Sequence, residues 1–544
     1  MVLNEKIGVA ALEPKPAGVR WTLPSIADVV FLVILATLLL RPEGTGLLGD
    51  ADTGWHIRNG EQILATHVVP LTDSFSYTRG GQPWFAWEWL FDVLVAGIHH
   101  VAGLNGVSLL AVLLVSGMFA LMFRLLRRRS RNLLVAVGLT MLAAAASQVH
   151  LLARPHVFTW LFTLLFVEVL FRFRETGGRV IWWLPALMLL WVNLHGGFLL
   201  GLVLIAMFAA ESAWIALRGA KDWRELGTLV AVGAASGVAT FLTPYGYQLH
   251  VHVYRYLSSS YLMNRIQEFA SPSFHEAGSG YFETFLVLAV VCCAVGWRRL
   301  RVIDVLLMLF AMHAGLYASR NIPIAGILMA YALAGPLTEV FGVAGTGAVP
   351  GLVRKAAEGL DAIAAELEVL EAQLRGHLVA GLVGVLLVLA ALHGGRIGGV
   401  QALHEEFSPT KFPVGAVDYM QAHGVRSRVF STDSWSGYLI YRMWPNFRVF
   451  MDDRHDFYGD EFVKRFVETL GGGADWKSLP DQYGANRVLV PPGLAYTSLL
   501  RATPEWHEEY SDDVSVLFCR GDGCPAGVAQ KVSSNEAVTR LGIH

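Results

Sequence analysis

Residues Gly49–Leu90 read GDADTGWHIRNGEQILATHVVPLTDSFSYTRGGQPWFAWEWL and closely follow an apolar run of membrane length, Ile26–Leu40. Carboxylates at the rim of a bilayer are costly to desolvate, so they tend to occur where a water-filled cavity or a cation needs them. Asp50 and Asp52 stand in such a place, two residues apart. Further polar residues follow in the same segment: His56, Arg58, Asp73 and Glu88. The segment therefore predicts chemistry at a membrane surface.

The composition predicts a polytopic membrane protein. Of the 544 residues, 54% are hydrophobic and only 16% are charged, whereas roughly a quarter of the residues are charged in a soluble protein. The apolar residues are concentrated in runs of roughly 17–23 residues, the length that a helix needs to cross about 30 Å of hydrocarbon. The net charge of −2 and the sequence's lack of a basic tract give no indication of nucleic-acid binding.

The apolar runs predict about eleven transmembrane helices. They lie at residues 26–40, 105–126, 132–152, 155–173, 180–197, 198–218, 226–243, 281–297, 301–318, 320–343 and 376–395. Lys and Arg accumulate on the cytoplasmic side of membrane proteins. Counted in this way, the helices place four basic clusters on one side: Arg124/Arg127/Arg128/Arg129/Arg131, Arg172/Arg174/Arg179, Arg218/Lys221/Arg224 and Arg298/Arg299/Arg301. We therefore expect a cytoplasmic N-terminal segment (1–25) and an extracytoplasmic C-terminal domain.

Two further helices are expected not to cross the membrane. Trp87–His100 is apolar but short and is interrupted by Asp and His residues, so we expect it to lie along the outer interface. Residues 352–374 (LVRKAAEGLDAIAAELEVLEAQL) have apolar side chains at helical spacing with charges on the other face. This second helix is expected on the cytoplasmic side. It lies on the bilayer or packs against the bundle, and we favour packing.

From about Phe407 the composition indicates a soluble α/β domain, because strand and helix patterns alternate. RVFSTD (428–433) and RVFMDD (448–453) predict strands that precede the helices GYLIYRMW and DEFVKRFVETL, while NRVLVPP and VSVLF predict a third and a fourth strand. The acidic run Asp452–Asp456 would follow a strand, where α/β sheets usually place ligand groups. Helix capping and a turn are the alternative, which we favour slightly. The spacing of Cys519 and Cys524 permits a disulfide but does not decide it.

This order of parts resembles the GT-C glycosyltransferases, which have one span, a long acidic outer loop, a bundle of many helices and an outer C-terminal domain. The likeness is greatest to the branch of the aminoarabinose transferases and protein O-mannosyltransferases. In that branch the first outer loop begins with an Asp-Glu-x-x-Tyr-like element and runs through a helix and a turn to a Pro-rich juxtamembrane helix. Here the matching parts are Asp52-Thr53-Gly54-Trp55, the helix Ile57–Ala65, the turn at Pro70, and Gln82-Pro83-Trp84 before Glu88-Trp89-Leu90.

The chain departs from that pattern in two places. Thr53 stands where the family has its second acidic residue, and PWFAWEWL replaces the family's double proline. The expected fold is a polytopic α-helical membrane protein, GT-C-like, with a C-terminal extracytoplasmic α/β domain. Its parts are a transmembrane domain (26–397) with outer loops at 41–104 and 244–280, and the C-terminal domain (398–544).

The resemblance implies an inverting membrane glycosyltransferase of the bacterial inner membrane. Its donor would be a polyprenyl-phosphate-linked sugar, and its acceptor a glycan, lipid or protein on the extracytoplasmic side. Such a transfer needs a base for the acceptor proton and positive charge for the departing phosphate. Asp52, with Asp50, is the candidate base or the ligand of a divalent cation, Mg²⁺ or Mn²⁺. The candidate substrate-binding residues are His56, Arg58, Glu88, Arg154, His156, His195, Arg265 and Arg320, with Arg255 as a further basic candidate.

Simpler roles and other functions compete with this hypothesis. Asp52 could cap a helix, Glu88 could lie at the membrane interface, and the glycines after His195 could serve only a turn. The chain could also be a lipid or saccharide transporter or flippase, or a non-catalytic scaffold whose α/β domain binds a partner. Transporters usually show internal repeats and helices broken at the midplane. The sequence shows no repeat and its charged residues collect at one face, so we favour a transferase.

Overall fold

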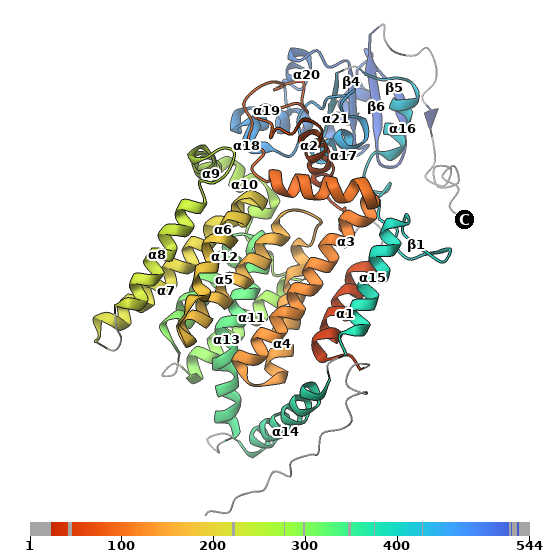
Figure 1. The fold of residues 1–544 in the computed structure, drawn as a ribbon. Helices are drawn as coiled ribbons and strands as arrows, with labels where there is room; N and C mark the ends of the chain where they lie inside the picture. Colours follow the sequence, from red (N-terminus) through yellow and green to blue (C-terminus); the bar gives the residue numbers. More distant parts are fainter. Residues whose placement is uncertain are drawn as a thin grey trace, which may run out of the picture.

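The computed structural model describes residues 23–41, 46–219, 223–276, 278–296, 300–345, 350–374, 376–426, 428–521, 524 and 530–531. A bundle of long helices carries an α/β domain at one of its ends (Figure 1). We call this end of the bundle the head end. The expected N-terminal segment 1–25 lies outside the described residues except for its last three residues.

Each predicted apolar run contains a helix. A helix satisfies its own backbone hydrogen bonds, which is the requirement for a chain in hydrocarbon. The bundle helices are α1 (Ile26–Leu39), α3 (Trp89–Ser130), α4 (Leu133–Ala146), α5 (His156–Thr176), α6 (Trp183–Leu194), α7 (Leu199–Leu217), α8 (Arg224–Ala239), α11 (Ser279–Gly296), α12 (Val302–Tyr317), α13 (Ile322–Gly345) and α15 (Leu378–Leu392).

The protein is a multi-pass membrane protein by the length and apolarity of these helices, but the expected count of spans is not confirmed. Among the described residues, 6 helices are long and apolar enough to cross a membrane, and a pair bent by 65° would make a seventh if it forms one span. The other apolar helices are shorter. The 6 are Trp89–Ser130, Leu133–His150, His156–Thr176, Gly196–Leu217, Ser279–Gly296 and Ser319–Val340.

Helix α3 changes direction at Gly103, whose φ of 58° lies in the left-handed region. Glycine adopts this conformation without the steric cost of a Cβ atom. Before the break, α3 runs across the head end of the bundle, and after it the helix descends along the bundle (Figure 1). The lateral part contains most of the segment Trp87–His100 that the sequence places along the outer interface.

Basic clusters gather at the end of the bundle opposite the head. Arg129 Nη2, in the last turn of α3, lies 3.0 Å from Asp304 Oδ1 of α12, and its Nη1 lies 3.5 Å from Glu175 Oε1 of α5. Helix α14 (Gly351–Gln373) packs at the same end (Figure 1), where Glu368 Oε1 accepts a hydrogen bond of 2.6 Å from Arg127 Nη2. The amphipathic helix therefore packs against the bundle, the alternative favoured from the sequence.

The C-terminal domain contains a mixed five-stranded sheet with the order β3-β4-β6-β5-β7. Its strands are β3 (Val429–Ser431), β4 (Arg487–Val490), β5 (Trp506–Ser511), β6 (Val516–Arg520) and β7 (Gln530–Lys531), and its longer helices are α16 (Val414–Ala422), α17 (Asp433–Met443), α19 (Asp460–Leu470) and α21 (Ala495–Arg501). Strands β3 and β4 are parallel, whereas β6 pairs antiparallel with β4 and β5. A disulfide joins Cys519 to Cys524.

The prediction of a strand at 448–453 is wrong. This segment is extended but pairs with the first loop instead of the sheet. Val449 forms a single parallel bridge with Ser76, and its N–H and C=O bond to Phe75 O and Tyr77 N, each at 3.0 Å. The Thr78 hydroxyl donates to the carbonyl of Phe450 at 2.5 Å. The partner lies far away in the chain, so no local pattern could have indicated it.

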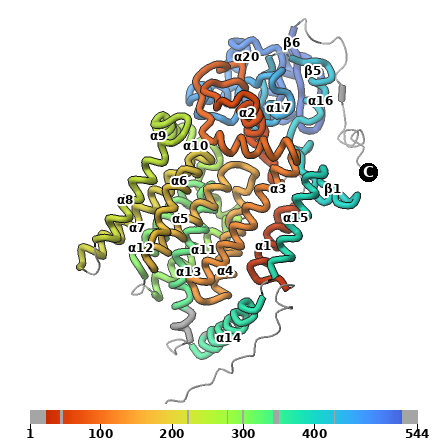
Figure 2. Tube along the Cα trace, in the orientation of Figure 1, coloured from red at the N-terminus to blue at the C-terminus, as the bar shows by residue number. Residues whose placement is uncertain are grey.

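Helix α2 (Asp52–Thr66) of the first loop packs on α17 of the C-terminal domain (Figures 1 and 2). A Cβ atom at Gly437 would lie 2.2 Å from the carbonyl oxygen of Ala51, and one at Gly54 would lie 2.5 Å from that of Gly437. The two backbones thus touch, which only glycine permits. Helix α2 also packs along α3. It is therefore held between the bundle and the C-terminal domain.

Candidate functional site

The two aspartates of the first loop stand at the start of helix α2. The backbone N–H of Asp52 donates to Asp50 Oδ1 at 2.8 Å, and the indole of Trp55 donates to Asp52 Oδ1 at 3.2 Å. The N-cap residue is Ala51, whose side chain makes no capping hydrogen bond. Asp52 is 6% exposed. It is thus a buried carboxylate in the first turn, and the capping role weighed from the sequence is not observed.

Arg154, in the turn before α5, joins these aspartates to the second long loop, residues 244–280. Its Nη1 lies 3.0 Å from Asp50 Oδ2, and its Nη2 lies 2.6 Å from Asp52 Oδ2. Glu268 Oε1 is also 3.0 Å from Nη1. Burial by itself would lower the pKa of the Arg154 guanidinium, but the surrounding carboxylates outweigh the effect of burial and raise this pKa. One arginine therefore meets three carboxylates, and the group as a whole is negative.

A third aspartate reaches the same place from the C-terminal domain. Carboxylate oxygens of Asp50, Asp52 and Asp453 lie within 4.8 Å of one another. Burial raises the pKa of Asp52, and the positive charge of Arg154 offsets part of this rise. Burial and the nearby charge of Asp52 raise the pKa of Asp453. Carboxylates that lie close together repel one another when both are ionised, and a cation bound between them removes this repulsion. Three carboxylate ligands suit Mg²⁺ or Mn²⁺, so this trio could hold the predicted metal.

The neighbour of Asp453 explains how this aspartate is held in place. Arg454 is 6% exposed, and its Nη2 lies 2.7 Å from both Asp452 Oδ2 and Asp73 Oδ1. Its guanidinium also stands over the ring of Trp84, 4.4 Å from the centroid. Asp73 and Trp84 belong to the first loop, so a buried ion pair and a cation–π contact hold this loop against the C-terminal domain.

An aspartate–histidine pair adjoins this trio. His455 Nε2 lies 2.9 Å from Asp433 Oδ2 at the start of α17. Burial opposes the charge of both groups, but their contact raises the pKa of His455 and lowers that of Asp433. Ligand atoms of this pair and of Asp453 also lie within 4.8 Å of one another. The acidic run that the sequence favoured as a cap thus supplies groups to the site.

The remaining predicted residues divide into three groups. Arg320 Nη1 lies 3.9 Å from Glu268 Oε2 and so stands beside the Arg154 cluster. His56, Glu88 and His195 form a buried chain next to it, in which burial raises the pKa of Glu88 to about 7 and lowers that of His56 to about 4. The other four residues lie outside the cluster. Arg58 donates to the carbonyl of Tyr441, and His156 bonds to the carbonyl of His150. Arg255 and Arg265 are exposed.

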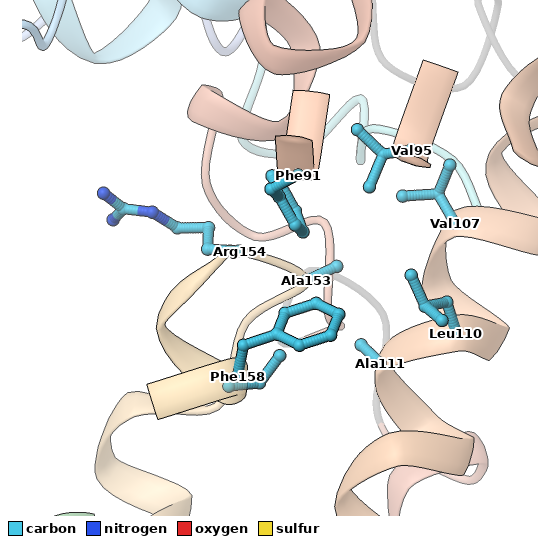
Figure 3. A pocket seen from close by; sticks show the side chains of 9 residues that line it. Phe91, Val95, Val107, Leu110, Ala111, Ala153, Arg154 and Phe158 are labelled. Atoms are coloured by element: carbon cyan, nitrogen blue, oxygen red, sulfur yellow. The ribbon is translucent and has the colours of Figure 1, made fainter. Parts of the chain in front are cut away.

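A small apolar pocket, with a cavity volume of only about 10 Å³, lies beside the charged cluster. It is lined by both arms of α3 and by the start of α5, and Figure 3 shows Arg154 at its edge with the guanidinium directed away from the pocket. Its other lining residues are Phe91, Val95, Val107, Leu110, Ala111, Ala153, Val157 and Phe158. An apolar pocket thus adjoins a positively charged group.

Sequence reasoning missed Glu268 as a member of the site. In the loop 244–280, Glu268 contacts Arg154, which also pairs with the aspartates of the first loop. Within the loop Glu268 stands in the short 3₁₀ turn Gln267–Phe269, which carries no motif. The available signal was only the length and mixed charge of the loop.

Comparisons with known proteins agree with the expected fold. No protein-family model matches the sequence, and no curated protein is significantly similar to it. The archaeal oligosaccharyltransferase AglB from Archaeoglobus fulgidus, solved with an inhibitory peptide and a dolichol-phosphate, has a TM-score of 0.50 at 12% identity, covering 86% of this chain and 69% of that chain. A likeness at this identity shows a shared fold, and the GT-C fold expected from the sequence is confirmed.

Two other solved structures are similar to a lower degree. The apo form of the Archaeoglobus fulgidus oligosaccharyltransferase has a TM-score of 0.49 at 11% identity, covering 92% of this chain and 75% of that chain. ArnT from Cupriavidus metallidurans in the apo state has a TM-score of 0.42 at 13% identity, covering 91% of this chain and 97% of that chain.

Proposed function

We propose that this protein is a membrane glycosyltransferase that moves a sugar from a polyprenyl-phosphate donor to an acceptor on the extracytoplasmic side, with inversion at the sugar carbon. One observation carries the proposal: Asp50 and Asp52 of the first loop and Asp453 of the C-terminal domain converge beside Arg154. The shared fold with a membrane oligosaccharyltransferase supports it. The acceptor would be a glycan, a lipid or a protein.

The trio Asp50, Asp52 and Asp453 would hold a divalent cation. When bound, such an ion neutralises charge on the donor phosphate. Asp52 is the base or a ligand of this ion. As the base it takes the proton of the acceptor hydroxyl, while the acceptor oxygen bonds to the sugar carbon and the sugar–phosphate bond breaks, its electron pair leaving with the phosphate. Burial raises the pKa of Asp52, and a raised pKa makes a carboxylate a stronger base near neutral pH.

The donor phosphate would be bound by the arginines at the cluster. Arg154 and Arg320 flank Glu268 and stand on the side of the first loop's aspartates. Charge-assisted contacts of arginine with phosphate are strong and specific in geometry. Arg265, exposed at the end of α10 (Ser260–Arg265), remains a candidate for an outer contact with the donor.

The proposal is tested by complementing a deletion strain and measuring its surface glycans by mass spectrometry. Wild-type protein and Asp513→Asn, a change of an exposed carboxylate in the C-terminal domain, should restore the missing product. Asp52→Asn and Asp453→Asn should reduce transfer by about 10²–10⁴-fold while the protein still accumulates in the membrane. Full restoration by Asp52→Asn would show that this carboxylate has no part in the reaction.

A further inference from the structure

The carboxylate of Glu268 lies among three basic side chains that come from two other parts of the chain. Its Oε1 accepts a hydrogen bond of 3.0 Å from Arg154 Nη1. Its Oε2 lies 3.8 Å from His150 Nε2 and 3.9 Å from Arg320 Nη1, which are separations of ion pairs and not of hydrogen bonds. His150 and Arg154 precede α5, whereas Arg320 lies in the turn before α13. These side chains form a site for an anion, and Glu268 fills it.

The charges around Glu268 favour an anion at this position. Burial by itself would raise the pKa of Glu268, but Arg154, His150 and Arg320 outweigh the effect of burial and lower this pKa to about 2. Glu268 is therefore ionised at neutral pH. Arginine binds the oxygens of a phosphate in the same geometry as those of a carboxylate. A phosphate group thus suits the position that the Glu268 carboxylate occupies.

The Nη1 nitrogen of Arg154 has both of its hydrogens engaged while Glu268 stays in place. A guanidinium Nη carries two N–H donors, and this one donates to Asp50 Oδ2 and to Glu268 Oε1, each at 3.0 Å. Arg154 Nη2 lies 2.6 Å from Asp52 Oδ2. A phosphate oxygen can therefore bond to Nη1 only after one of its two carboxylates has left.

Glu268 is the carboxylate that can leave. Asp50 is fixed at its other oxygen, because Oδ1 accepts the backbone N–H of Asp52 at the start of α2. The Glu268 side chain is longer and 27% exposed, so rotation about its side-chain bonds carries the carboxylate into solvent. The backbone of its turn stays bound meanwhile. Ser319 Oγ donates to the carbonyl of Glu268 at 3.1 Å, and the N–H of Ser319 donates to that of Ala270 at 2.9 Å.

We propose that Glu268 is an internal competitor for the phosphate site, so that a lipid phosphate binds to Arg154 and Arg320 by displacing this carboxylate. The inference rests on the proposed function, which assigns these two arginines to the donor phosphate. Transfer of the sugar leaves a phosphate monoester on the lipid, and such a group carries nearly two negative charges and three acceptor oxygens. The return of Glu268 to Arg154 weakens the hold on this product and speeds its release.

Binding of polyprenyl phosphate to the full-length protein in phosphatidylcholine nanodiscs tests the proposal without any transfer. Glu268→Gln keeps the size of the side chain but removes its charge. It should bind polyprenyl phosphate at least about tenfold more tightly than wild type, the equivalent of one charge-assisted hydrogen bond that no longer competes. Glu276→Gln removes an exposed carboxylate of the same loop and should bind the lipid as wild type does.

Inorganic phosphate, titrated in the same way, identifies the source of the phosphate group. Tighter binding of polyprenyl phosphate alone would identify a lipid headgroup as the ligand. Tighter binding of both probes would mean that the site accepts any phosphate monoester, and tighter binding of inorganic phosphate alone would identify a free phosphate. Each of these results supports the competition by Glu268. Equal or weaker binding of both probes by Glu268→Gln would overturn it, because the carboxylate would then help to build the site.

A second variant and an inhibition assay separate competition from a structural role. Glu268→Ala removes the hydrogen bond as well as the charge and should also bind polyprenyl phosphate more tightly than wild type. If both variants fail to fold, Glu268 is a structural residue and the proposal is wrong. In the transfer assay, added polyprenyl phosphate should inhibit Glu268→Gln at least about tenfold more strongly than wild type. Tighter binding by the variants, with no sugar transfer by wild type, would contradict only the proposed function.

Discussion

Gly437→Ala is the sharpest test of a site shared between the first loop and the C-terminal domain. The added Cβ atom would lie 2.2 Å from the carbonyl oxygen of Ala51 and 2.6 Å from its carbon. Both of these atoms are backbone, so no side-chain rotation relieves the clash. Ordinary contact begins at 3.4 Å, and helix α17 must therefore move away from the start of α2 by about 1.2 Å, the difference between the two distances.

This displacement affects the site more than it affects folding. Forcing an extra methyl group into a packed contact costs about 1–3 kcal/mol, which a folded domain can tolerate. The start of α17 carries Asp433, which pairs with His455 two residues after Asp453. A shift of about 1 Å in a catalytic group can cost about 10²-fold in rate. We therefore expect transfer to fall by about 10²-fold, with only a modest loss of stability.

The assay compares sugar transfer and thermal unfolding in the same purified samples. Gly97→Ala is the matched control because Gly97 also lies in a helix at the head end and an added Cβ meets nothing within 4 Å. This control should keep full activity and gain up to about 1 kcal/mol in stability from helix propensity. A folded Gly437→Ala protein with wild-type transfer would refute the reasoning, because the site would then not depend on the fit of α17 against α2.

Two further predictions concern the parts that build the site. Adding Mn²⁺ at 100 times its dissociation constant should stabilise wild type and Asp513→Asn by about 2.7 kcal/mol, which is measured as a higher melting temperature. The melting temperature of Asp453→Asn should not change. An equal shift in all three proteins would place the ion elsewhere. Arg454→Met leaves the buried Asp73 and Asp452 without their cation, so the free energy of unfolding should fall by about 3–5 kcal/mol, and a loss below about 1 kcal/mol would contradict the buried ion pair.

Elements that depend on local features of the chain could be predicted from the amino-acid sequence. Apolar runs specified the bundle helices, and alternating patterns specified α17, α19, β4 and β6. The amphipathic pattern indicated α14, and the placement of carboxylates after the first apolar run indicated Asp50 and Asp52. In each of these cases the relevant energy, whether helix formation in hydrocarbon or desolvation of a charge, depends on residues that are close together in the chain.

The contacts between these elements could not be predicted in the same way, because they form between distant parts of the chain. Asp453 belongs to the site because Arg454 pairs with Asp73 of the first loop and because Gly54 and Gly437 let two helices touch. The segment 448–453 pairs with the first loop because Ser76 and its neighbours offer it backbone partners. Arg58, expected at the site, bonds instead to the carbonyl of Tyr441. Each outcome depends on packing and ion pairing between residues that are distant in sequence, and a local sequence pattern does not indicate such partners.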